Sequence, residues 1–141
     1  MKKLLVGVSV MAILVGVVVP ILAQPDNASA CMEHGYSPGY YRHHLDAWGS
    51  IDPYAWFDVA MRRSSGDPLV GPHAYLIDVL WTRGGQWDAF DRQAVAALIN
   101  SDLYTPAWYS EWTVKSAVLH AYNTGDWSTS KTLFEAANSL D

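Results

Sequence analysis

This 141-residue sequence has one cysteine and few basic residues. A single cysteine cannot form a disulfide within the chain, so Cys31 does not cross-link the fold. Apolar packing therefore has to stabilise the fold. Only 9 Lys and Arg residues oppose 14 Asp and Glu residues, so the formal net charge is −5. No basic stripe is present to contact phosphates, which argues against nucleic acid as a partner.

The longest uncharged run lies near the N-terminus, at residues 4–23, directly after two lysines. A basic start, an apolar core and then the small residues Ala28, Ser29 and Ala30 are the order of a secretory signal peptide. Cleavage after Ala30 makes Cys31 the first residue of the mature protein, and Ala23 is a second candidate cleavage point. The sequence therefore predicts that residues 1–30 direct export.

Two other interpretations of this segment stay open. Residues 4–23 approach the ~20 residues that a membrane-spanning helix needs, so they can act as an uncleaved signal anchor with the lysines in the cytoplasm. Lipid attachment to Cys31 is the third interpretation. All three predict a secreted or cell-surface protein that meets the membrane only through an uncleaved helix or a lipid. Its exported part, residues 31–141, has 7 basic and 13 acidic residues, a formal charge of −6.

The exported part is predicted to be one all-α domain. Prolines that follow a capping-type residue predict three short helices, starting at Pro38, Pro53 and Pro72. Apolar stripes at helical spacing predict three more, over residues 86–102, 110–123 and 130–140. No sustained alternation and no repeat of 20 to 50 residues is present. We expect a single small bundle of five to six short helices after the signal peptide or anchor.

The segment at residues 35–48 holds the densest set of chemically active side chains. The candidate functional or structural centre consists of Tyr41, Arg42, His44, Asp46 and Trp48. On a helix that starts at Pro38, His44 lies between Tyr41 and Trp48 on the apolar face, whereas His43 is rotated by about 100°. Because adjacent histidines on a helix point in different directions, this pair cannot clamp one metal ion. We expect His44 to be a hydrogen-bonded structural residue.

A metal site at this segment would be the alternative. Cys31 and His34 have the C-x-x-H spacing found in zinc sites, and residues elsewhere would have to complete the site. The candidates for completing it are His44, Asp46, His73 and His120. A full zinc signature has two half-sites, and this sequence has one at most. No cofactor is therefore predicted, and a divalent metal at Cys31, His34 and His44 stays the minor alternative.

Aromatic residues are abundant, with 7 Trp and 8 Tyr. Exported, acidic, Trp-rich domains can bind sugars by stacking, and residues 105–112 gather Trp108, Tyr109 and Trp112 around the start of a predicted helix. The competing interpretation is that these rings cover one end of a small bundle. Packing is favoured over a stacking surface at this segment.

Three stretches of the sequence carry a family resemblance. Residues 37–48, Ser-Pro-Gly-Tyr-Tyr-Arg-His-His-Leu-Asp-Ala-Trp, resemble a motif of the form Cys-[Ser/Thr]-x-Gly-[Tyr/Phe]-Trp-Lys-Asn-His followed by Asp-Ala-Trp. Residues 92–100 and 133–138 resemble two later landmarks of the same family of exported or cell-surface modules. The family has no established activity, so the resemblance implies location, fold and His44 as the residue of interest. The motif cysteine is replaced by Tyr36, so a family disulfide is not expected.

These observations together favour an exported α-helical module without enzymatic activity. We expect it to act in adhesion, in envelope organisation or in binding a glycan or protein partner, because no complete catalytic constellation is visible in the sequence. The alternative is an extracellular hydrolase, metal-dependent or carboxylate-based, that uses His44 with an acidic residue. The acidic candidates are Glu33, Asp46 and Asp52.

Overall fold

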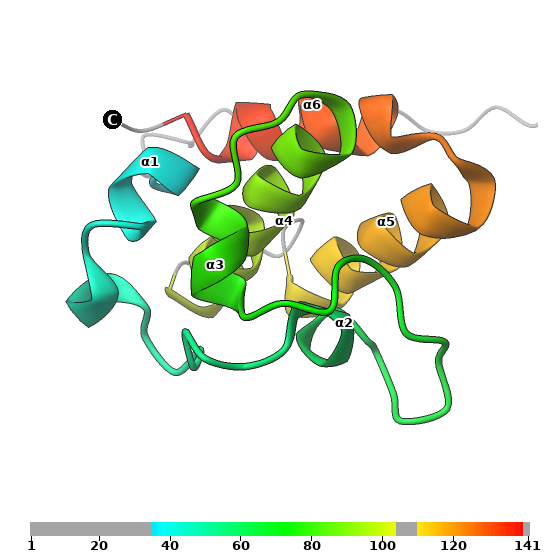
Figure 1. The fold of residues 1–141 in the computed structure, drawn as a ribbon, viewed down its shortest axis with the longest axis horizontal. Coiled ribbons are helices and arrows are strands. Elements are labelled where there is room, and N and C mark those ends of the chain that lie inside the picture. The colour runs from blue at the N-terminus through cyan, green and yellow to red at the C-terminus, as the bar shows by residue number, and fades with distance from the viewer. Residues whose placement is uncertain (1–34, 104–109, 140–141) are drawn as a thin grey trace, which may run out of the picture. The chain divides into compact units, whose positions relative to one another are not determined.

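A computed structural model describes residues 35–103 and 110–139, and these residues form an all-α bundle (Figure 1). Within them the helices are α1 (Pro38–Tyr41), the 3-10 helix η1 (Leu45–Ala47), α2 (Phe57–Ala60), α3 (Leu76–Leu80), α4 (Gln86–Leu103), α5 (Glu111–Thr124) and α6 (Trp127–Ala137). None of them is both long and apolar enough to span a bilayer. The predicted signal or anchor segment at residues 1–30, together with Cys31, Glu33, His34, Trp108 and Tyr109, lies outside the described residues.

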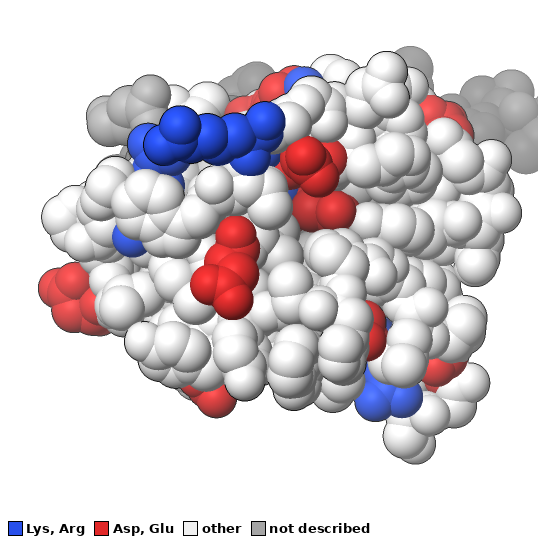
Figure 2. Space-filling view, viewed as in Figure 1, with Lys and Arg blue, Asp and Glu red and all other residues white. Residues whose placement is uncertain are grey.

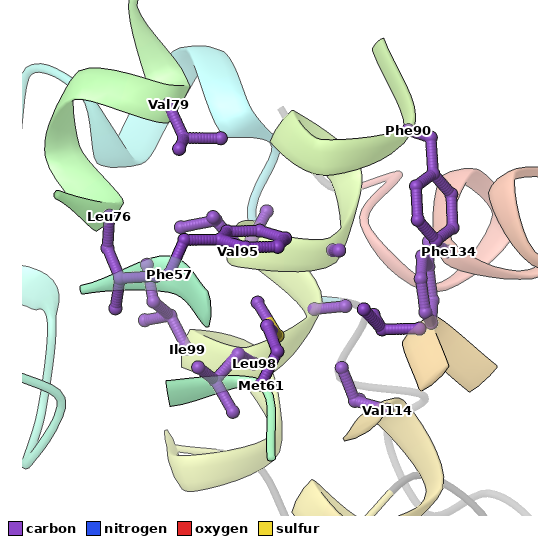
Figure 3. Close-up of a cluster of buried hydrophobic side chains, with 14 of the residues drawn as sticks. Phe57, Met61, Leu76, Val79, Phe90, Val95, Leu98, Ile99, Val114 and Phe134 are labelled. Atoms are coloured by element: carbon purple, nitrogen blue, oxygen red, sulfur yellow. The ribbon is translucent and has the colours of Figure 1, made fainter. Parts of the chain in front are cut away.

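Helix α4 is the centre of the bundle. It packs against α1, α3, α5 and α6, and every residue from Ala94 to Ser101 is buried because neighbours cover all sides of the helix. Figure 3 shows Phe90 of α4 beside Phe134 of α6, and the centroids of these two rings are 5.8 Å apart. The predicted helix over residues 86–102, with its wide apolar face, is confirmed.

The two C-terminal helices begin at capping side chains. Ser110 Oγ accepts a hydrogen bond from the Thr113 N–H, and α5 ends at Gly125, which has a φ of +79°, so both predicted ends of this helix are confirmed. The predicted start of the last helix at Ser130 is wrong. Helix α6 begins three residues earlier, because the Asp126 carboxylate accepts a hydrogen bond from the Thr129 N–H.

The first proline-started helix begins as predicted but is much shorter. Ser37 Oγ accepts from the Tyr40 N–H, which caps α1, yet the helix ends after Tyr41. The Trp48 indole Nε1 donates a hydrogen bond to the Tyr41 carbonyl at 2.9 Å, so the chain folds back where a longer helix would continue. Burying Trp48 in this way outweighs the local helical tendency, since a short helix is marginal by itself.

The other two proline-started helices are also displaced. The prolines at 53 and 72 are followed by turns and bends, and the one-turn helices α2 and α3 begin only at Phe57 and Leu76. The Phe57 N–H donates to the Ala74 carbonyl at 2.8 Å, and the Leu76 N–H donates to the Ala55 carbonyl at 3.0 Å. These bonds pair the two segments side by side, so backbone groups that a longer helix would use internally bind a distant segment instead.

Candidate functional site

Two of the five residues singled out by the sequence are structural. Tyr41 is fully buried and Trp48 is 2 % exposed, and both belong to the core under α1 and η1. Their bond through the Trp48 indole, described above, holds the turn between these two elements. Tyr41 and Trp48 are both buried, as the predicted apolar face requires. They do not lie on one continuous helix, because α1 ends at Tyr41.

The phenol of Tyr41 leads to a buried polar network at Asn100. Tyr41 Oη donates to Asn100 Oδ1 at 2.5 Å, and the Tyr36 N–H donates to the same oxygen at 3.0 Å. Asn100 Nδ2 donates to the Tyr36 carbonyl at 3.0 Å and to Asn138 Oδ1 at 2.7 Å. The amide thus uses two acceptor and two donor positions. The three stretches that carry the family resemblance meet here, as structural contacts between the N-terminal segment, α4 and α6.

The prediction that His44 lies on a buried apolar face is wrong. Because α1 ends before it, His44 is exposed, and its ring stacks on Tyr40 with centroids 4.2 Å apart. Arg42 and Asp46 are exposed as well. The Arg42 guanidinium lies 5.2 Å from the Trp81 ring centroid. The segment therefore presents Arg42 and the two histidines to solvent.

The residues that the structure describes contain no group of three or more His, Cys, Asp or Glu side chains placed to hold a metal ion. Within this part of the chain, the predicted ligand His44 belongs to no such group. The other two predicted ligands, Cys31 and His34, precede the first described residue. A metal at this segment stays a prediction.

A carboxylate and an imidazole meet between α2 and the segment that precedes α3. His73 Nδ1 lies 2.7 Å from Asp58 Oδ2, and the Asp58 side chain is 7 % exposed whereas that of His73 is 70 % exposed. Because a carboxylate only accepts, His73 Nδ1 is the donor, which leaves Nε2 as an acceptor when the ring is neutral. The other carboxylate oxygen, Oδ1, is buried and has no hydrogen-bond partner among the described residues.

The same imidazole belongs to an exposed aromatic cluster of four side chains, Tyr54, Trp56, His73 and Tyr75. The Trp56 ring stacks on His73 at a centroid distance of 4.1 Å with planes 3° apart, and it lies 4.4 Å from Tyr75. Tyr54 meets Tyr75 edge to face at 6.2 Å. This aromatic cluster forms a continuous set of ring contacts on the surface.

The short antiparallel pairing before α2 and α3 positions the aromatic cluster. Trp56 and Tyr75 form an isolated bridge, so their side chains lie opposite each other on one face. Tyr54 and His73 stand two residues before them, and their rings contact Tyr75 and Trp56, respectively. The sequence patterns did not indicate this cluster, because they predicted that both segments are helical. The alternation Tyr-x-Trp and His-x-Tyr was the signal that could have revealed it.

A second buried carboxylate lies inside the bundle. Tyr122 Oη donates to Asp91 Oδ1 at 2.7 Å, and Asp91 is 5 % exposed. The pKa of Asp91 is raised to about 6, chiefly by burial; the bond from Tyr122 acts in the opposite direction, and the nearby Asp88 charge adds to the increase. Burial also raises the pKa of Tyr122 above its usual value. This pair is internal, whereas the aromatic cluster is exposed and can meet a ligand.

No family model, curated protein or solved structure matches this chain. The family resemblance of the N-terminal motif thus stays a prediction. The features of the chain that bear on its function are the geometry of the aromatic cluster and the sequence of the N-terminal segment.

Proposed function

We propose that the protein is an exported binding module that contacts a glycan through the aromatic cluster of Tyr54, Trp56, His73 and Tyr75. The observation that carries the proposal is the continuous set of exposed ring contacts, which includes a fixed imidazole. Export is supported by the order of basic, apolar and small residues in segment 1–30, and it is part of the proposal.

Exposure of these rings is the first support. Tyr54 is 61 %, Trp56 38 % and Tyr75 37 % exposed, although the same chain buries Trp48 and Phe57 completely or nearly so. Large apolar side chains that gather on a surface commonly mark a contact site. Aromatic rings suit the apolar faces of sugar rings, which stack on them while sugar hydroxyls stay free to hydrogen-bond.

The Asp58–His73 pair is the second support. A buried carboxylate oxygen without a donor costs stability, so Asp58 is poorly explained as a stabilising residue. Its bond fixes the orientation of an imidazole that is otherwise open to solvent. Orientation before binding lowers the entropy lost when a ligand docks. His73 Nε2 can then accept a hydrogen bond from a sugar hydroxyl beside the stacking rings.

Binding of neutral oligosaccharides to the purified protein tests this function. Titration calorimetry with β-linked glucose, xylose and N-acetylglucosamine oligomers should detect binding to at least one of them. Trp56→Ala should weaken this binding about fivefold or more, since a stacked ring contributes on the order of 1 to 3 kcal/mol. Trp112→Ala is the matched control, because Trp112 is 64 % exposed on α5 and makes no ring contact with the cluster. Equal losses in both variants, or no binding of any oligomer, would contradict the proposal.

A hydrolase that uses the same pair is the second candidate function. An imidazole held by a carboxylate can accept a proton from water, and the 2.7 Å bond favours this position over the hydrolase centred on His44. The candidate predicts slow hydrolysis of the bound oligosaccharide, abolished by His73→Ala and by Asp58→Asn while His44→Ala stays active. Binding without product formation would leave only the binding function.

A further inference from the structure

Arginines without carboxylate partners gather around Trp81. Of the basic residues after the N-terminal segment, Arg63, Lys115 and Lys131 pair with carboxylates four residues away. Arg42 and Arg83 have no such partner among the described residues, although acidic residues outnumber basic ones nearly two to one in this part of the chain. Figure 2 shows Lys and Arg side chains grouped over α1 and the connection from α3 to α4, with Asp and Glu side chains beside the group and elsewhere on the same face.

The Trp81 ring is the centre of this group. It is 48 % exposed, with the Arg42 guanidinium 5.2 Å from its centroid and the His43 ring edge-on at 5.2 Å. Arg42 Nε also donates to His43 Nε2 at 3.2 Å, which orients both side chains. A cation and an exposed aromatic face are thus presented together.

Arg83 completes the group from the connection between α3 and α4. Arg83 is exposed, and its two neighbours in sequence, Thr82 and Gly84, accept hydrogen bonds from a residue of α4. Arg92 donates to the Thr82 carbonyl at 3.0 Å and to the Gly84 carbonyl at 2.9 Å. These two bonds fix the backbone on both sides of Arg83, so the fold sets the point from which its side chain extends.

We propose that Arg42, Trp81 and Arg83, here called the Trp81 cluster, bind an acidic sugar of the same glycan that contacts the aromatic cluster. The guanidinium groups receive the carboxylate of a uronic acid unit, and the Trp81 ring stacks on its sugar ring. This inference rests on the proposed glycan-binding function and names the class of ligand: a glycan in which acidic units alternate with neutral ones.

The position of the two clusters supports a single ligand. Tyr75 directly precedes α3 and Trp81 directly follows it, so the clusters lie at the two ends of one helix. Six residues of helix correspond to about 9 Å along the axis. A short linear oligosaccharide is long enough to span this axial distance.

Charge supports a sparsely charged ligand over a polyanion. The exported part has a formal charge of −6, and Asp88 borders the cluster at Gly84, where an added Cβ would lie 1.7 Å from Asp88 Oδ2. Local guanidinium groups attract one carboxylate, whereas the acidic remainder repels a dense row of charges within the screening length of about 8 to 10 Å. Heparin and anionic lipid surfaces are disfavoured for this reason.

Two matched probes test the inference on the full chain. The first is a short oligosaccharide of alternating glucuronic acid and N-acetylglucosamine, and the second is the same oligosaccharide with its carboxyl groups reduced to alcohols. We expect the acidic form to bind about tenfold more tightly at low salt and this advantage to shrink as salt rises. Arg42→Gln and Arg83→Gln should each weaken binding of the acidic form far more than binding of the reduced form, and so remove most of the advantage.

The control variant is Arg62→Gln, which removes the same charge from an arginine that also has no carboxylate partner in the described structure. It should keep the full preference for the acidic probe. Equal binding of the two probes, an equal effect of Arg62→Gln, or tighter binding of heparin or phosphatidylglycerol vesicles would overturn the inference. If Trp56→Ala binds neither probe, the result bears on the proposed glycan-binding function. If a variant loses only its preference for the acidic probe, the result bears on the Trp81 cluster. The two failures are therefore distinguishable.

Discussion

The Tyr41 hydroxyl and Asn100 Oδ1 lie 2.5 Å apart although 59 residues separate them in sequence. Through this bond and the two backbone bonds of Tyr36, the segment that precedes α1 is fixed to the last turn of α4. Asn100 is 2 % exposed, so water cannot replace these partners. The amide is therefore the polar centre on which the N-terminal part of the fold depends.

Replacing Asn100 by leucine should destabilise the protein strongly. The substitution leaves buried groups of Tyr36, Tyr41 and Asn138 without the amide, and the expected loss in the free energy of unfolding is on the order of 3 kcal/mol. Urea denaturation followed by circular dichroism measures it. Asn123→Leu, at the exposed end of α5, is the control and should change stability by less than about 0.5 kcal/mol. Similar losses in the two variants would refute the central position of Asn100.

Stability should depend on pH through Asp91. Its pKa is raised from 3.8 to about 6 in the folded state, so folding favours the protonated carboxyl. The contribution to stability is complete below about pH 4 and is lost as the pH rises through about 6, a total of about 3 kcal/mol. Asp91→Asn keeps an acceptor for Tyr122 but cannot ionise, so its unfolding free energy should change little between pH 5 and pH 8.

The control for this pH dependence is Asp78→Asn, because Asp78 is exposed on α3. Urea denaturation at pH 5 and pH 8 should show the same loss of stability in this variant as in the wild type. If Asp91→Asn still weakened by about 1.4 kcal/mol over that range, which is the part of the total loss that falls above pH 5, the buried carboxyl would not be the titrating group.

Gly71 should tolerate no side chain. Its φ is +88°, and a Cβ built there would lie 2.2 Å from a ring carbon of Phe57. Gly71→Ala is therefore expected to lower the free energy of unfolding by at least about 2 kcal/mol, from backbone strain and displacement of Phe57. Gly66→Ala is the comparison, since its nearest neighbour would be 3.9 Å away and its φ is not positive. A neutral Gly71→Ala would show that the segment can shift freely.

His44→Ala should leave stability nearly unchanged. The ring is exposed and stacks only on Tyr40, so the expected change in the free energy of unfolding is within about 0.5 kcal/mol. Trp48→Ala, four residues later in the same segment, should cost about 3 to 5 kcal/mol because that side chain is buried. Thermal melts of both variants measure the contrast. A large loss in His44→Ala would restore the structural interpretation of this histidine.

Sequence patterns were sufficient where local chemistry and burial agree. Helix α4 follows from a wide apolar stripe, and α5 follows from Ser110 at its start and Gly125 at its end. The all-α class was also predictable, because these long segments carry clear helical periodicity. The N-terminal interpretation, with export of residues 31–141, is likewise a statement of the sequence alone and stays a prediction.

Tertiary structure decided the segments in which local signals compete with distant contacts. The pattern at residues 38–48 is helical. However, the Trp48 indole donates a hydrogen bond to the Tyr41 carbonyl, so the helix ends there and His44 lies at the surface. Similarly, Pro53 and Pro72 resemble helix starts, but the backbone around Trp56 pairs with the backbone around Tyr75. Short helices have little stability of their own, so long-range hydrogen bonds and burial determine their length. The aromatic cluster and the Asp58–His73 pair exist only because of that pairing.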